Sequence, residues 1–171
     1  MIKFINGNFY TMEGNINDGI IKNGYMIIEN GIITDIGQCH NIGQSDETNE
    51  DRKLKTDIEI IDLQGKLVFP GFIDGHTHLG MWEDSAGFEG DDGNEDTDPC
   101  TPQLRAIDGI NPNDRAFTDA CKAGITTVVT GMGSANVIGG ILYAVKTAIN
   151  SKDVISSIDE RIIAPIAIKM A

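Results

Sequence analysis

The sequence predicts an α/β fold, in which a small β domain precedes a domain of alternating strands and helices. In the first part, two β-rich runs, 25–29 and 32–36, flank Asn30-Gly31. This is the strongest short signal for a β-hairpin, because a type I′ turn needs two residues with positive φ. In the second part, the β-branched run 125–130 follows a segment of helical spacing. Such a run is typical of a parallel strand that is buried on both faces.

The domain boundary is predicted after residue 64. Within 1–64, the short apolar run 2–5 precedes an Asn-Gly turn, and 57–63 alternates apolar and polar residues, so both are expected to be strands. The segment 39–56 is polar and charged, which predicts a solvated loop. Residues 65–171 are assigned to the second domain.

The second domain offers a helix and further strands. The Asn113-Asp114 pair can cap a helix that runs to about Lys122, and Gly124 is placed to end it. After the strand at 125–130, we expect a third strand over Ile141–Lys146 and a fourth over Ile166–Ile168. The alternation of helix and strand favours a parallel sheet.

Composition excludes several classes of function. The formal net charge is −13, and the chain has no clustered Lys/Arg, so nucleic acid is not an expected partner. We find neither an apolar run of about 18 residues nor a signal-peptide core, which predicts a cytoplasmic protein without membrane spans. The three cysteines are far apart in the sequence and indicate neither a disulfide framework nor a thiolate zinc site.

The stretch 70–80, Pro-Gly-Phe-Ile-Asp-Gly-His-Thr-His-Leu-Gly, carries the strongest chemical signal. Side chains alternate between the two faces of a strand, so His76 and His78 are expected on one face, with Asp74 in phase and Thr77 opposite. Imidazole nitrogens bind zinc and similar ions, although two of them do not fill the coordination shell. The ordinary alternative is a pair of surface histidines, but their place at the end of an apolar strand favours a metal.

This stretch resembles the first barrel strand of the amidohydrolase superfamily, in which Pro-Gly-Phe-Ile-Asp-x-His-x-His begins the metal site. The resemblance implies a TIM-type (β/α)8 hydrolase barrel, and 65–171 has room for about four βα units, its first half. It also implies one or two divalent ions, zinc favoured, with His76 and His78 as ligands. Asp74 would orient the site from behind these ligands.

Many two-metal amidohydrolases use a strand-four lysine whose carbamate bridges the metals. Lys169, at the end of the expected fourth strand, resembles that residue. An ammonium beside metal ions would be repelled, which makes a carboxylated lysine chemically reasonable there. An ordinary terminal lysine is the alternative, and the sequence leaves the two open.

Loops at the expected catalytic face supply candidate substrate contacts. Eight acidic residues lie between Glu83 and Asp98, and no calcium-loop pattern fits them. A mobile acidic surface loop and a substrate loop for a cationic group both remain open, with Trp82 and Glu83 as contacts in the second case. Ser134 and Asn136, after the strand at 125–130, could orient a substrate or simply form a turn.

Taken with the resemblance, these features predict the N-terminal portion of a metal-dependent amidohydrolase. It would hydrolyse a C–N bond in a small amide, cyclic amide or dipeptide through metal-activated water, in the manner of imidazolonepropionase-like enzymes or metallo-dipeptidases. The family's general base and further ligands would come from a C-terminal half, so this chain alone is expected to be inactive and the full-length protein homo-oligomeric. The alternatives are a non-catalytic fragment or subunit of a split enzyme, and a β-rich binding domain with fortuitous histidines.

Overall fold

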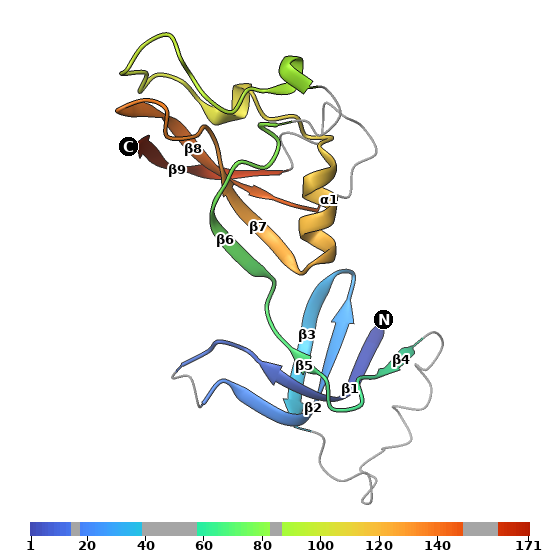
Figure 1. Cartoon of the computed structure of the whole chain (residues 1–171). Helices are drawn as coiled ribbons and strands as arrows, with labels where there is room; N and C mark the ends of the chain where they lie inside the picture. The colour runs from blue at the N-terminus through green and yellow to red at the C-terminus, as the bar shows by residue number, and fades with distance from the viewer. Residues whose placement is uncertain (15–17, 39–57, 83–86, 149–160) are drawn as a thin grey trace, which may run out of the picture. The chain divides into compact units, whose positions relative to one another are not determined.

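The computed structural model describes residues 1–14, 18–38, 58–82, 87–148 and 161–171. The chain divides into two compact units, Met1–Pro70 and Gly71–Ala171 (Figure 1). The sequence placed this division after residue 64. The difference arises because Leu67–Val68 pair with the first strand of the chain and so extend the N-terminal unit.

The N-terminal unit is one five-stranded sheet. Its strands are β1 (Ile2–Tyr10), β2 (Ile20–Glu29), β3 (Ile32–Gln38), β4 (Glu59–Asp62) and β5 (Leu67–Val68). Their order is β3-β2-β1-β4, and β5 also pairs with β1. The predicted hairpin is present: β2 and β3 are antiparallel, and Asn30 and Gly31 between them have φ of 50° and 81°. The predicted loop over 39–56 lies outside the described residues.

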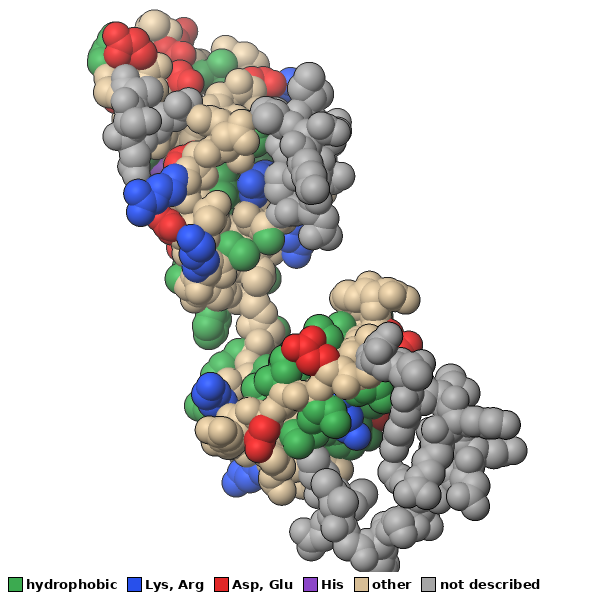
Figure 2. Space-filling model, turned by 90° about the vertical axis from the view of Figure 1, so that its right-hand side faces the viewer, with side chains coloured by type: hydrophobic (Ala, Val, Ile, Leu, Met, Phe, Trp, Pro, Cys, Tyr) green, Lys and Arg blue, Asp and Glu red, His purple; other side chains and the backbone are tan. Residues whose placement is uncertain are grey.

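Much of this sheet's apolar surface is uncovered within its own unit. Phe9 is buried, and Tyr10 stacks on Phe69 at 4.6 Å between ring centroids. Figure 2 shows hydrophobic side chains gathered on the surface of this unit. The large exposed ones among the described residues are Met1, Met12, Ile32, Ile33, Ile60, Leu67 and Phe69.

The second unit contains a four-stranded sheet and one α-helix among its described residues. The elements are β6 (Phe72–Thr77), α1 (Arg115–Lys122), β7 (Ile125–Thr130), β8 (Ile138–Lys146) and β9 (Ile162–Met170), with 3-10 turns at Gly87–Gly90 and Ala106–Asp108. The strand order is β6-β7-β8-β9. β6 and β7 are parallel and joined through α1, which gives one βα unit of the predicted kind.

The predicted series of four βα units is not formed by the described residues. β8 is antiparallel to β7, and β9 is antiparallel to β8. The connection between β7 and β8 explains the first reversal, because a parallel crossover needs a dozen or more residues. Only the short stretch from Gly131 to Val137 separates these two strands. Among its described residues the second unit is therefore mostly β-sheet, and the one parallel pair of this sheet, β6–β7, lies at its edge.

The core of the second unit lies between α1 and the two central strands. Phe117 from α1 packs with Val128 of β7 and Val145 of β8. The helix begins as predicted, because the Asp114 carboxylate accepts the Ala116 N–H at 2.9 Å. Gly124, with φ of 88°, follows its last turn. Across the described segments, no helix has both the length and the hydropathy that crossing a membrane requires.

Candidate metal centre

The two histidines of the His-x-His stretch lie together at the end of β6. The centroids of the His76 and His78 rings are 5.4 Å apart, with an interplanar angle of 73°. The Asp74 carboxylate accepts the His76 N–H at 3.1 Å and so fixes the backbone at His76. Thr77 donates its hydroxyl to the Val129 carbonyl at 3.2 Å and so ties the strand end to β7. The motif thus fixes its own backbone locally.

The ring of His78 is fixed by the segment that follows β7. Its Nδ1 lies 2.6 Å from the carbonyl oxygen of Gly131. A carbonyl can only accept, so in the neutral ring Nδ1 carries the proton and Nε2 keeps its lone pair. Histidines that bind metals are commonly held in this way, with the second ring N–H donated to a backbone carbonyl.

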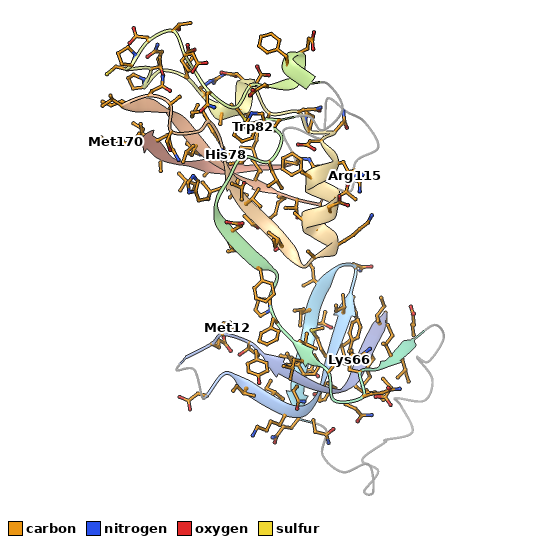
Figure 3. All side chains as sticks on the ribbon, viewed as in Figure 1. Met12, Lys66, His78, Trp82, Arg115 and Met170 are labelled. Carbon is orange, nitrogen blue, oxygen red and sulfur yellow. The ribbon has the colours of Figure 1, made fainter. Side chains whose placement is uncertain are left out.

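Lys169 of β9 meets His76 across the sheet. Its Nζ lies 2.8 Å from Nε2 of His76, and the lysine is only 8% exposed. β6 and β9 are the two edges of this sheet, and in a flat sheet three strand spacings would separate them by about 14 Å. The sheet must therefore curl so that its two edges face the same space. Figure 3 shows His78 and Met170, which mark the ends of these two strands.

Two neighbouring glycines in β8 allow close approach of other segments. A Cβ at Gly139 would lie 3.2 Å from the Cβ of Lys169, so this glycine leaves room for the lysine. A Cβ at Gly140 would lie 2.4 Å from the Leu104 carbonyl oxygen, so this glycine leaves room for the backbone of Leu104. No role was predicted for these two glycines from the sequence. The signal that could have identified their role is a Gly-Gly pair inside an apolar strand, which often marks close approach of another chain segment.

The donor set fits part of a divalent metal site. The described residues contain no group of three His, Cys, Asp or Glu side chains that could hold an ion. They do bring together two imidazoles and one buried amine, all three on the list of residues predicted from the sequence. Imidazole nitrogen suits zinc and similar borderline ions. His76, His78 and Lys169 could thus supply part of the coordination shell of a metal, and the remaining positions are open to water or to further donors.

The predicted substrate-loop residues are in different situations. Trp82 packs edge-on against His78, with 4.9 Å between ring centroids, whereas Glu83 lies outside the described residues. Ser134 is exposed. Asn136 is buried, and its Nδ2 donates to the Asp98 carbonyl at 2.8 Å, a contact that anchors the acidic loop. Its role toward a substrate stays a prediction.

Several acidic side chains of the loop region are engaged locally. The Thr97 hydroxyl and backbone N–H both donate to Glu95, which lowers the pKa of that carboxyl. Arg105 donates to Asp108 at 2.6 Å and lowers the pKa of Asp108 through hydrogen bonding. Glu95, Arg105 and Asp108 line an open pocket of about 270 Å³, together with Met81, Leu104 and Met132.

The chain is similar in sequence to enzymes that are named as an amidohydrolase, an imidazolonepropionase and a deaminase. No family model matches the chain. It is 32% identical over 131 residues to Amidohydrolase tasK of Hapsidospora irregularis, which covers 76% of this chain and 12% of that protein. It is 52% identical over 60 residues to a probable imidazolonepropionase of Dictyostelium discoideum, covering 34% of this chain and 13% of that one. A 5-methylthioadenosine/S-adenosylhomocysteine deaminase of Bacillus cereus is 36% identical over 78 residues, 46% of this chain and 15% of its own length.

A solved structure matches nearly the whole fold. An amidohydrolase from Thermotoga maritima superposes with a TM-score of 0.72 and 34% identity, covering 99% of this chain and 38% of that chain. The present chain thus spans little more than a third of that structure and about an eighth of the curated relatives it matches. The relatives, the fold match and the His-x-His strand agree, and the chain belongs to the amidohydrolase superfamily.

Proposed function

We propose that this chain supplies the N-terminal part of the metal centre of a hydrolase acting on C–N bonds. The observation that carries the proposal is the meeting of three residues at one point: Lys169 Nζ is 2.8 Å from His76 Nε2, and His78 lies beside His76. In this proposal His76 and His78 hold a divalent ion through their Nε2 atoms. Further donors and a general base come from residues beyond these 171, in the same polypeptide or in a separate one.

Each residue has a distinct task at such a site. Asp74 holds the His76 backbone, and the Gly131 carbonyl keeps His78 in the tautomer whose Nε2 can bind. When bound, the ion polarises the scissile carbonyl and lowers the pKa of a coordinated water towards about 7. The amidohydrolase names of the relatives support the hydrolytic assignment, and zinc is the ion we favour.

Lys169 is proposed to act as a carboxylated ligand. As an ammonium, it donates a hydrogen bond to His76 Nε2 and occupies the lone pair that a metal needs. Addition of CO2 to the neutral amine forms a carbamate and releases one proton, which removes the competing donor and adds oxygen ligands. We therefore expect bicarbonate to strengthen metal binding, and only when Lys169 is present.

The substrate is proposed to be a small molecule with a C–N bond outside ordinary peptide chains. The relatives named imidazolonepropionase and 5-methylthioadenosine/S-adenosylhomocysteine deaminase support a cyclic amide or amidine-like substrate. A dipeptide remains within the same chemistry. The acidic residues Asp92 and Glu95, which line the open pocket, favour a substrate that carries a cationic group.

Metal content of the purified 171-residue chain tests the proposal. We expect at least one zinc or cobalt ion to bind per chain. Elemental analysis and intact mass, with and without bicarbonate, measure it. The double variant His76→Ala/His78→Ala should lose it. His40→Ala, which removes the third histidine of the sequence, is the matched control and should keep it. Binding that survives loss of both His76 and His78 contradicts the proposal.

A further inference from the structure

The Trp82 side chain packs against the ring of His78. Its ring meets the imidazole edge-on, at 4.9 Å between centroids and 77° between planes, and both residues are labelled in Figure 3. Edge-to-face aromatic contacts of this kind have a preferred geometry. The His78 ring is therefore constrained at Nδ1 by the Gly131 carbonyl and across its face or edge by the indole.

The acidic loop holds Trp82 in place. The indole Nε1–H donates to the carboxylate of Asp91, and the backbones of Trp82 and Asp91 form an antiparallel bridge. The same carboxylate accepts the Gly93 N–H at 3.2 Å. Gly93 leaves the space that the indole fills, since a Cβ there would lie 2.0 Å from the ring. This loop thus forms a slot shaped for one aromatic side chain.

The slot around Trp82 and the ring of His78 both form hydrogen bonds with the short segment that follows β7. The Gly93 carbonyl accepts the Gly133 N–H at 2.7 Å, and the Gly131 carbonyl binds His78 Nδ1 at 2.6 Å. The segment after β7 therefore sets the position of both the ring and its aromatic neighbour. Without the contacts of Trp82 and Gly93, the ring of His78 would be held by its hydrogen bond to Gly131 and could rotate more freely.

We propose that Trp82 is a positioning residue that, through Asp91 and Gly93, fixes the ring of His78 with Nε2 presented to the metal. The inference rests on the proposed function only in the test that measures metal binding. It assigns Trp82 and the acidic loop a role in shaping the site, and it adds Asp91, which sequence reasoning left without a role. Removing an outer partner of a metal ligand typically weakens metal binding by about 10–100-fold.

The first test uses the metal-free chain. Long-range ¹H–¹⁵N spectra of the histidine rings at pH 8 distinguish the Nδ1–H from the Nε2–H tautomer, with His78 assigned by the loss of its signals in His78→Gln. We expect the Nδ1–H form in the parent and in Trp82→Phe, which keeps an aromatic edge, and a mixture of both tautomers in Trp82→Ala. Phe88→Ala is the control, because Phe88 is a 91% exposed aromatic of the same loop. An unchanged His78 tautomer in Trp82→Ala overturns the inference.

The second test uses cobalt as the probe. Trp82 is the only tryptophan in the sequence, so quenching of its emission by Co²⁺ in the parent reports on metal beside His78. By calorimetry, we expect Trp82→Ala to weaken cobalt binding by roughly tenfold, with Trp82→Phe and Phe88→Ala close to the parent. Parent-like affinity in Trp82→Ala contradicts the inference. Absence of cobalt binding in the parent contradicts the proposed function instead, and the tautomer test still decides the role of Trp82.

Discussion

The central and edge strands of the second sheet have opposite characters. β7 and β8 carry buried side chains, with Val128 at 1% exposure and Thr130 at 0%. β6 and β9 expose large apolar residues, including Ile73 and Met170, and it is these edges that bring His76 and Lys169 together. Folding energy and candidate chemistry therefore lie on different strands, so mutations should be able to separate them.

β9 inverts the usual pattern of burial. Ile166, Ile168 and Met170 on one face are more than half exposed, whereas Lys169 on the other face is buried. A strand that served only stability would bury the isoleucines and expose the lysine. In β9 the buried residue is thus the lysine that meets His76, and the isoleucines contribute little burial within this unit.

The largest expected effect comes from removing the core of the central strands. Phe117 is 1% exposed and packs on Val128 and Val145, with the Arg161 guanidinium 4.6 Å from its ring. Phe117→Ala should lower the free energy of unfolding by about 3–5 kcal/mol, the usual cost of emptying such a site. Urea unfolding of the 171-residue chain measures it. Phe88→Ala, the same change at an exposed position, should leave the unfolding midpoint unchanged; equal losses in both variants would break the comparison.

The second-largest effect is expected at Lys169 of the edge strand β9, where a substitution should change metal binding without lowering stability. Lys169→Met keeps the length of the side chain and removes a buried amine, so stability should be unchanged or higher. Bicarbonate-dependent binding of cobalt should fall about tenfold or more, measured by titration calorimetry. Lys146→Met, an exposed lysine of β8 whose Nζ donates to Thr127, is the control and should keep the metal. A large loss of stability in Lys169→Met would show that the lysine supports the fold itself.

The local parts of this arrangement were predictable from the sequence, and the non-local ones were not. The closeness of His76 and His78, the Asp114 cap and the β-branched strand Ile125–Thr130 depend on neighbours within a few residues, and all three are present. Strand direction depends on connections and on pairing across the sheet. The antiparallel course of β8 and β9 was missed because apolar runs do not encode direction, although the short link before β8 did contain that information.

The candidate site was predictable to the same extent. Its three proposed ligands were named from motif and position, but their meeting depends on a curled sheet and on space left by Gly139. The Trp82–Asp91–Gly93 slot was not predicted, because the tryptophan and its carboxylate partner are nine positions apart in the sequence. From the sequence, this loop was predicted only from its charge and composition, with Trp82 and Glu83 as candidate substrate contacts.

A smaller effect should follow from crowding the lysine through its neighbour. In Gly139→Ala, the new Cβ lies 3.2 Å from the Lys169 Cβ and 3.4 Å from the Met132 side chain, so the lysine must shift by a few tenths of an ångström. We expect a loss of about 1 kcal/mol in unfolding free energy and weaker cobalt binding. Gly75→Ala, where nothing lies within 4 Å, is the matched glycine control. Parent-like cobalt binding in Gly139→Ala would show that the lysine tolerates this displacement.

The smallest effect extends the comparison to the edge strand β4 of the N-terminal sheet. The Asp62 carboxylate accepts the Gln64 N–H at 2.9 Å and the Asn6 amide at 3.0 Å, and these hydrogen bonds lower its pKa below the ordinary value of 3.8. A carboxyl whose pKa is lowered by folding stabilises the native state above the unfolded value, and that contribution disappears as pH falls through the folded value. Asp62→Asn should therefore unfold at lower urea than the parent at pH 7, and the difference should shrink once pH falls below about 3.8.

Urea unfolding followed by far-ultraviolet circular dichroism between pH 7 and pH 3 measures this difference. Glu59→Gln removes one carboxylate from the same strand and supplies the baseline for loss of charge alone. A gap between parent and Asp62→Asn that stays constant down to pH 3 would mean that the amide fails for steric reasons. A gap that closes on acidification assigns the stabilisation to the ionised carboxylate, and it would show that the edge strand of this sheet, unlike β9, uses its charged residue for stability.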